Sequence, residues 1–238
     1  MQVRHIFVGI DLGDKNSVAR IAVDRDKSER FGFLNTRQGR ARLFREAKRR
    51  SEQADGATIV MAYEASSCGF VLSDEAEALG IKCRVLAPTK MEKSVEQRQH
   101  KNDDRDADDV LEKLRGHVLA GNRLPTVWVP DLETRDDREL IRTRLDLTEK
   151  QTQIKAQIRM LIKRHGLEKP SGLGAGWTIG YRRWLQALTE SEQLLGWSTR
   201  QALDSLLRQL QCLEAEIDRV QKPLEELANE PRHKPIIE

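Results

Sequence analysis

Five short apolar runs in the first 90 residues constrain the fold of this chain more than any other feature. They lie at residues 5–10, 17–24, 30–34, 57–63 and 82–87. Such runs, bounded by polar and turn-forming residues, are typical of β-strands. Helical segments are expected at residues 36–51, 70–79 and 103–119, which gives the order β-β-β-α-β-α-β-α. A strand meander followed by alternating units predicts an α/β fold with a mixed sheet and flanking helices.

The chain changes character after Pro130. Residues 133–165 are typical of one long charged helix, and residues 166–180 of a glycine-rich linker. Further on, apolar residues recur with alternating spacings of four and three, at Leu206, Leu210, Leu213, Ile217, Val220, Leu224 and Leu227. This heptad pattern predicts a coiled coil or a helical hairpin with residues 133–165, with a kink near Pro223. An ordinary amphipathic helix on a core is the alternative.

Charge is distributed unevenly along the chain, although its net value is only +3. Residues 151–184 hold seven Lys or Arg and one acidic residue, whereas residues 185–238 hold six Lys or Arg and ten acidic residues. A basic middle beside an acidic end suits a polyanionic partner that one region alone binds. Ordinary solvated helix faces explain the charge alone equally well.

The three cysteines, Cys68, Cys83 and Cys212, are widely spaced and form no CxxC pair. Neither a disulfide framework nor a structural zinc site is expected, and a reducing compartment fits best. The N-terminus has no signal-peptide pattern, and no apolar run is long enough to span a membrane. We therefore expect a cytoplasmic protein with no membrane partner.

Four carboxylates stand where the predicted fold would bring them together. Asp11 and Glu64 each follow a buried strand, and Asp103 and Asp106 lie three residues apart at a helix start. Burial of a carboxylate is costly unless a cation or hydrogen bonds compensate it. A cluster of carboxylate oxygens suits Mg²⁺ or Mn²⁺, and two such ions support phosphodiester chemistry. Taken singly, each residue also has an ordinary role, as a turn residue or as an acid at the positive end of a helix.

Three short boxes carry these carboxylates: Val8-Gly9-Ile10-Asp11, Tyr63-Glu64-Ala65 and Lys101-Asn102-Asp103-Asp104-Arg105-Asp106-Ala107. They resemble the Asp, Glu and Asp-x-x-Asp-Ala boxes of the DEDD transposases of the insertion sequence 110 family. That family is similar to the pilin-gene-inverting recombinases. The resemblance covers about residues 5–165 and continues more loosely through the helical region.

The resemblance implies a RuvC-like, ribonuclease-H-like catalytic domain at residues 1–130, followed by a coiled-coil region at residues 131–238 that forms a homo-oligomer. It implies cutting and rejoining of DNA by metal-dependent phosphoryl transfer, guided by a structured bridge RNA. Carried over onto matching positions, the catalytic and metal-binding residues are Asp11, Glu64, Asp103 and Asp106, with Mg²⁺ or Mn²⁺ as cofactor. Asp104 is an alternative ligand beside Asp103, and the three-residue spacing to Asp106 favours Asp103.

The resemblance also implies a second catalytic domain, with a nucleophilic serine, after the coiled coil. The chain ends at residues 235–238, about where that domain would begin, so we expect the N-terminal part of a transposase or recombinase. Ser66, Ser67 and Ser171 do not match the position of the nucleophile. On this interpretation the chain alone lacks the covalent strand-exchange step.

Other functions fit parts of the sequence. Residues 9–13 (GIDLG) are similar to the first phosphate loop of actin-like ATPases and sugar kinases. A second Asp-x-Gly loop and a Gly-Gly adenosine box, which those proteins need, do not follow. A junction-resolving nuclease of the same fold would use the same four carboxylates with water as the nucleophile. A non-catalytic nucleic-acid-binding fragment would bind its partner without metal.

A basic stretch interleaved with aromatic residues is the predicted nucleic-acid-binding surface. Cations neutralise phosphates, and aromatic rings stack on unpaired bases. Its residues are Lys155, Arg159, Lys163, Arg164, Lys169, Trp177, Arg182 and Arg183, with Tyr181 and Trp184 between or beside them. The rings have an ordinary alternative role as core anchors. Residues 37–50 are a second basic stretch, with seven Lys or Arg against Glu46.

Overall fold

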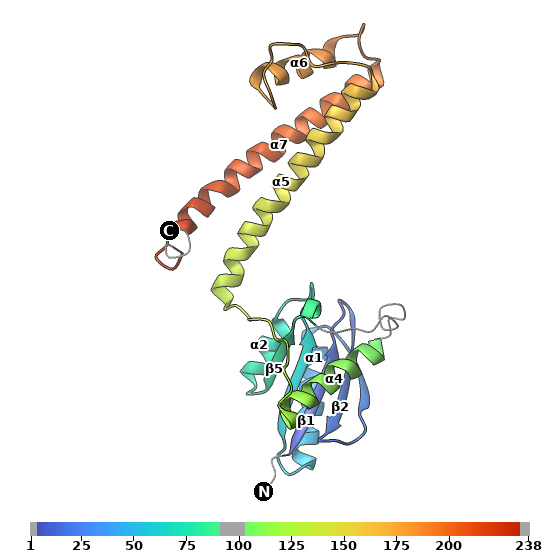
Figure 1. Cartoon of the computed structure of the whole chain (residues 1–238), viewed down its shortest axis with the longest axis vertical. Coiled ribbons are helices and arrows are strands. Elements are labelled where there is room, and N and C mark those ends of the chain that lie inside the picture. Colours follow the sequence, from blue (N-terminus) through green and yellow to red (C-terminus); the bar gives the residue numbers. More distant parts are fainter. Residues whose placement is uncertain (1–3, 91–102, 234–238) are drawn as a thin grey trace. The chain divides into compact units, whose positions relative to one another are not determined.

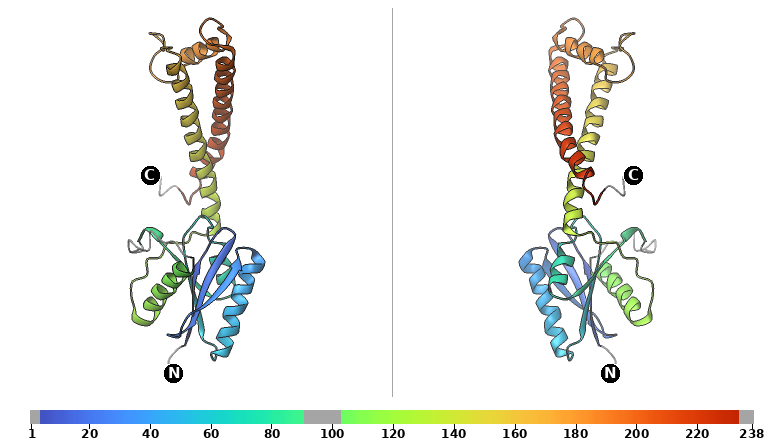
Figure 2. Two further views of the ribbon diagram at one scale, coloured as in Figure 1. Left: turned by 90° about the vertical axis from the view of Figure 1, so that its right-hand side faces the viewer. Right: turned by 90° about the vertical axis from the view of Figure 1, so that its left-hand side faces the viewer.

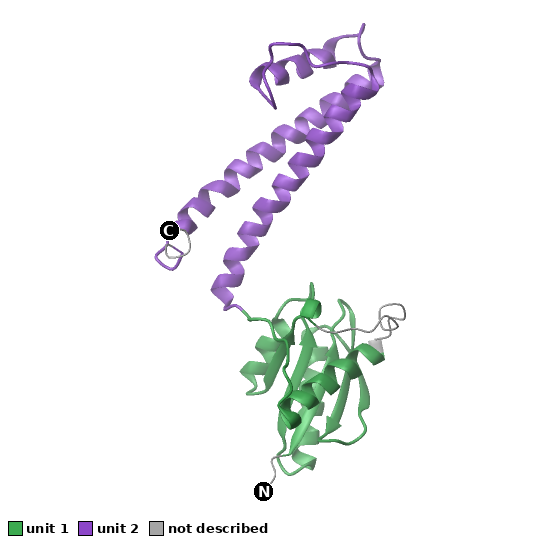
Figure 3. Ribbon diagram, in the orientation of Figure 1, with its two compact units in different colours: residues 1–129 green, residues 130–238 purple. Residues whose placement is uncertain are grey.

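The computed structural model describes residues 4–90 and 103–233. The chain divides into two compact units, Met1–Val129 and Pro130–Glu238 (Figure 3). Each unit has its own hydrophobic core: two buried clusters lie in the first unit and a third lies in the second.

The first unit is built on a five-stranded sheet in the order β3-β2-β1-β4-β5. Its strands are β1 (His5–Asp11), β2 (Asn16–Val23), β3 (Glu29–Leu34), β4 (Thr58–Glu64) and β5 (Lys82–Leu86). The first three form an antiparallel meander, whereas β4 pairs parallel with β1 and β5 parallel with β4. The predicted mixed sheet is confirmed, and each strand begins and ends within one residue of its predicted bounds. The arrangement is compatible with a ribonuclease-H-like fold.

Helices cover both faces of this sheet (Figures 1 and 2). They are α1 (Arg37–Gln53), α2 (Val71–Ala78) and α4 (Asp103–Ala120), and a short 3-10 helix, η1 (Pro88–Lys90), follows β5. Side chains alternate between the two faces along a strand. Ile6, Val8 and Ile10 of β1 therefore pack against α1 and α2, whereas Phe7 packs against α4.

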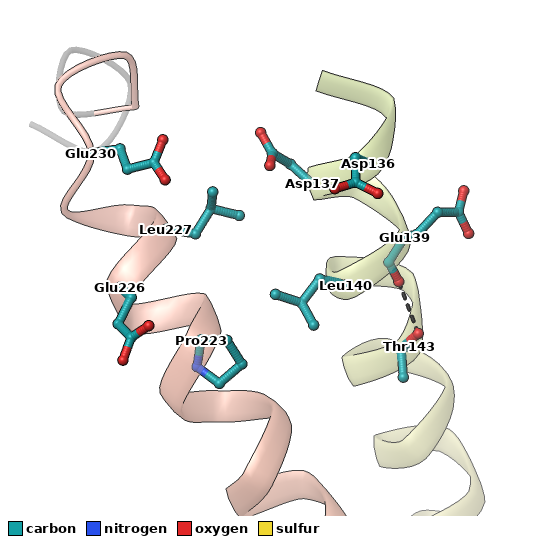
Figure 4. A pocket seen from close by; sticks show the side chains of 9 residues that line it. All are labelled: Asp136, Asp137, Glu139, Leu140, Thr143, Pro223, Glu226, Leu227 and Glu230. Carbon is teal, nitrogen blue, oxygen red and sulfur yellow. Dashed lines mark hydrogen bonds between the residues drawn. The ribbon is translucent and has the colours of Figure 1, made fainter. Parts of the chain in front are cut away.

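The second unit consists of α5 (Leu132–Arg164), α6 (Ile179–Glu190) and α7 (Trp197–Ala228). α5 and α7 lie side by side in all views (Figures 1 and 2). They run antiparallel, since residues 136–143 of α5 line a groove of about 480 Å³ together with residues 223–230 (Figure 4). Leu140 and Leu227 form the apolar part of that groove, and acidic side chains surround them. The helical hairpin is thus confirmed, and its coiled-coil character stays a prediction.

The predicted seam lies on the α7 face that meets α5, where Leu210 and Ile217 are buried. α7 continues through Pro223 to Ala228 as one helix. At the far end of the hairpin, α6 and the loop before it pack on Ile158, Leu161 and Leu203. In the described part of the chain, no helix combines the length and the apolar composition that crossing a membrane requires.

Candidate active site and nucleic-acid surface

Asp11 and Glu64 end two adjacent parallel strands at the same edge of the sheet. The last paired residues of β1 and β4 are Ile10 and Tyr63, and the two acids follow them. Alternation also gives the acids a common face: Phe7 on β1 and Val60 and Ala62 on β4 pack on the α4 side. Asp11 and Glu64 continue these alternating positions, and both are half-buried. The strand pairing alone thus brings two carboxylates to one edge and one face.

The first turn of α4 lies at the same edge. Asp108 binds Arg20 of β2, which is paired with Gly9 in the β1–β2 register. Two turns later, Arg115 donates to the carbonyl of Asp26 in the β2–β3 turn, at the opposite edge. α4 therefore begins beside the ends of β1 and β4 and runs away from them. The backbone of α4 lies close to β1 at Gly9, where an added Cβ would lie 2.3 Å from the Leu111 nitrogen.

Asp106 belongs to this first turn, next to the fully buried Ala107, and is itself half-buried. Asp103 is the first residue of α4 and precedes Ala107 by four residues. Positions 103 and 107 therefore lie on the same side of the helix, the side that packs on the sheet. The Asp103 side chain lies outside the described part of the structure, as do Lys101 and Asn102.

Asp104 has a different setting from its neighbours. Its carboxylate accepts a hydrogen bond from the Arg30 guanidinium of β3 at 2.6 Å. Asp108, one turn later, accepts bonds from Arg20 at 2.5 Å and from the Ser28 hydroxyl at 2.8 Å. Burial raises the pKa of Asp108, but these hydrogen bonds outweigh it and hold that pKa below its ordinary value. Asp104 and Asp108 thus fasten α4 to the β2–β3 side of the sheet.

Of the four candidate acids, only the side chains of Asp11, Glu64 and Asp106 belong to the part of the chain that the structure describes. In the described residues, no three His, Cys, Asp or Glu side chains gather closely enough to hold a metal ion. The donor set consists of carboxylate oxygens with no imidazole or thiolate, and this chemistry suits Mg²⁺ or Mn²⁺ better than zinc.

Sequence reasoning missed the residues that fasten α4. Arg20 is a charged residue within the apolar part of β2, on the face that α4 covers. Asp104 and Asp108 are spaced by one helical turn, so they line up along one side of α4. The position of Arg20 indicated that the covering helix supplies an acid there, but the sequence did not show which acid it is.

The predicted nucleic-acid surface in the second unit is only partly open. Arg159, Lys163, Arg164 and Arg183 are exposed. Arg182, in contrast, makes a bidentate pair with Glu214 of α7, at 2.6 Å for both bonds. That pair raises the pKa of Arg182, although burial opposes the rise. Arg182 therefore ties α6 to α7 and has less capacity for a phosphate.

The aromatic residues of this stretch pack on one another. Tyr181 is buried, and its ring stacks on Trp184 at 5.6 Å and meets the Trp177 ring edge-on at 5.3 Å. The Lys155 ammonium lies 5.8 Å from the Trp177 ring centre and that of Lys169 lies 4.5 Å from the Tyr181 ring centre. The rings thus anchor the small core of the second unit, which is the alternative role that the sequence also allowed. Trp177 and Trp184 remain half-buried.

Comparison with known proteins points in one direction. Residues 8–166 match the family model of the DEDD transposases of insertion sequence 110, which is described as a transposase. Over 184 residues the chain is 29% identical to "Putative transposase y4qE" of Sinorhizobium fredii (strain NBRC 101917 / NGR234), an alignment that covers 77% of this chain. The chain spans 44% of the length of that relative. The segment matched by the family model contains all four candidate carboxylates.

Proposed function

Because the family model covers more than half of it, the chain belongs to the DEDD transposase family of insertion sequence 110, and we propose that its first unit cuts DNA at a divalent metal site. The ligands in this proposal are Asp11, Glu64, Asp103 and Asp106. The observation that carries it is the shared edge and face of Asp11 and Glu64, beside which α4 begins. When bound, Mg²⁺ or Mn²⁺ would polarise the scissile phosphodiester and stabilise the charge that develops on its oxygens.

The chain's own residues have separable tasks in this proposal. Asp11 and Glu64 present oxygens from the ends of two adjacent parallel strands, and α4 adds those of Asp103 and Asp106. Arg20, Ser28 and Arg30 bind Asp104 and Asp108, so their task in this proposal is to position α4. The Arg30–Asp104 pair supports Asp103 over Asp104 as the ligand, because the Asp104 carboxylate is already engaged with a cation.

Metal-dependent stabilisation tests the site directly. A cation that binds only the folded chain raises its unfolding temperature by mass action. We expect Mn²⁺ to raise the unfolding temperature of the whole chain and of the Asp104→Asn variant, because the amide oxygen of that variant can still accept the hydrogen bond from Arg30 that holds α4. The rise should disappear in Asp11→Asn and in Asp103→Asn, and Mg²⁺-dependent DNA cleavage should disappear with it. A rise that persists in Asp11→Asn, or that is lost only in Asp104→Asn, contradicts the assignment.

For the second unit we propose binding of a structured bridge RNA that guides the recombination. Exposed cations on α5 and α6, among them Arg159, Lys163, Arg164 and Arg183, support a phosphate-binding role. The test is binding of the noncoding RNA transcribed beside the gene against a scrambled RNA, across a salt series. Selective binding at moderate salt is expected. Equal, salt-sensitive binding of both RNAs would leave only general phosphate attraction and would contradict RNA guidance.

Self-association through the helical hairpin belongs to the same proposal. Leu132, Ile141, Leu145 and Met160 of α5 are exposed apolar side chains, which support a further helix packing there. The proposal predicts a mass in solution that is a multiple of the chain mass, measured by light scattering. A chain that stays monomeric at micromolar concentration contradicts it.

A further inference from the structure

The outer side of α1 carries cations that have no acidic partner among residues 4–90 and 103–233. Arg37, Arg42, Arg45 and Lys48 are exposed and make no ion pair with any residue that the structure describes. We call these four residues the α1 cation face. Other basic residues of α1 are already paired: Arg40 with Glu75, and Arg49 and Arg50 with Glu46. The hydrogen bond from Arg49 is the main cause that lowers the pKa of Glu46 to about 2.

The helix that presents these cations is held firmly. Leu43, Phe44 and Ala47 bury its inner side in the core, and the Thr36 side chain caps its first turn. At Gly39 the helix lies so close to β3 that an added Cβ would be 2.0 Å from the Leu34 carbonyl oxygen. Cations on a rigid helix keep their relative positions, so a charged ligand finds them already arranged.

The helix begins at the edge that holds Asp11. β3 ends there, because Leu34 is paired with Asn16 at the start of β2. The Asn35 backbone donates to the Lys15 carbonyl at 2.9 Å, and the Asn35 side chain donates to the Gly13 carbonyl at 3.0 Å. Gly13 comes two residues after Asp11. The α1 cation face therefore starts beside the turn that follows the candidate metal ligand and runs away from it along the helix.

We propose that the α1 cation face binds the phosphate backbone of duplex DNA that passes around this edge, because α1 covers the face of the sheet opposite to the one that carries Asp11 and Glu64. Arg37 and Lys48 are eleven residues apart, or roughly 16 Å along the helix, a distance that corresponds to about five base pairs of duplex. The exposed residues of α1 include no large apolar side chain, unlike a helix that lies on a membrane. The inference rests on the proposed function, because it assigns the path of the DNA that the same edge would cut.

The salt dependence of DNA affinity tests this surface. Each phosphate contact adds about 0.9 to the slope of log affinity against log salt concentration. In the whole chain, Arg45→Gln/Lys48→Gln should reduce that slope by about two and weaken binding at low salt. Arg49→Gln is the matched control, since it removes an exposed arginine of the same helix whose guanidinium already binds the Glu46 carboxylate. It should leave the slope unchanged.

The possible outcomes separate the surface from the active site. Glutamine favours helix, so circular dichroism and the Mn²⁺-dependent rise in unfolding temperature should be unchanged in all these variants. Suppose that Mn²⁺ still raises the unfolding temperature, but the double variant and Arg49→Gln show the wild-type salt dependence of DNA affinity. The DNA-binding role of the α1 cation face is then overturned, and the proposed metal site stands. If duplex RNA of the same sequence shows the slope change and DNA does not, the assignment of DNA is overturned. If the wild-type chain neither binds DNA nor responds to Mn²⁺, both proposals are overturned.

Discussion

Gly9 lies two residues before Asp11, where the backbone of α4 crosses β1. A Cβ at this position would lie 2.3 Å from the Leu111 nitrogen and 2.5 Å from the Ala107 carbonyl oxygen. Both are backbone atoms of a helix, so Gly9→Ala has to push α4 away from the sheet. We expect the free energy of unfolding to fall by about 1–3 kcal/mol, measured by urea denaturation. The Mn²⁺-dependent stabilisation should weaken as well, because α4 carries two of the four proposed ligands.

Gly32 of β3 offers the matched control at the same residue scale. A Cβ there would meet only the end of the flexible Arg30 side chain, at 3.3 Å. Gly32→Ala should therefore change the free energy of unfolding by no more than about 0.5 kcal/mol. If Gly9→Ala and Gly32→Ala lowered the free energy of unfolding equally, the cost would come from replacing a strand glycine. The close contact with α4 would then make no contribution.

Single residues also show the limit of prediction from sequence. Asp11 and Glu64 could be assigned to one edge of the sheet, because parallel neighbours end together and each acid follows an apolar run. The partners of Asp104 and Arg182 could not be assigned. Arg30 lies 74 residues from Asp104 in the sequence, and Glu214 lies 32 residues from Arg182. Such pairings depend on how finished elements pack, which local composition does not encode.

At the scale of elements, the packing of α4 on the sheet depends on ion pairs as well as on apolar contacts. The folded chain lowers the pKa of Asp108, so this carboxylate stabilises the fold at pH values above the ordinary Asp pKa. The contribution is lost as the pH falls through the lowered value. Asp108→Asn should cost about 1 kcal/mol at neutral pH, a modest figure because the side chains of the pair are partly exposed.

Urea denaturation of the wild type and Asp108→Asn across a pH series checks the sign. The difference between the two should be largest near neutral pH and should vanish in acid, below the lowered pKa of Asp108. Glu52→Gln, which changes an exposed acid of α1, should show no such difference at any pH. A difference for Asp108→Asn that stays constant into acid would mean that the amide perturbs packing and that the ion pair contributes nothing.

The strands could be predicted from the sequence more reliably than the helices of the second unit. The strands were predictable because short apolar runs bounded by turn residues are compatible with few structures other than a β-strand. α6 was missed, since Gly172, Gly174 and Gly176 precede it and all three adopt the left-handed backbone conformation typical of loops. Thr178 then caps the helix start through its side chain. The spacing of Trp177, Tyr181 and Trp184 was the available signal, because intervals of four and three residues mark one face of a helix.

At the scale of the whole molecule, each of the two units has the core that independent folding requires. The two clusters of the first unit lie on opposite faces of one sheet and use only residues before Pro130. The core of the second unit is smaller and gathers at one end of the α5–α7 hairpin, around Ile158, Leu185 and Leu203. Elsewhere the hairpin contact includes polar pairs such as Arg144 with Gln221. The first unit should therefore unfold more cooperatively than the second.

Separate expression of residues 1–129 and 130–238 tests this expectation. The first fragment should unfold in one sharp transition that far-ultraviolet and near-ultraviolet circular dichroism report together. Because the α1 cation face lies within it, the fragment should also keep the DNA-binding slope that Arg45→Gln/Lys48→Gln reduces. The second fragment should be helical with a broad transition, since apolar burial is concentrated at one end. A first fragment that keeps its far-ultraviolet signal but loses its near-ultraviolet signal would be a molten globule. In that event the sheet depends on residues after Val129, and the two units are one folding unit.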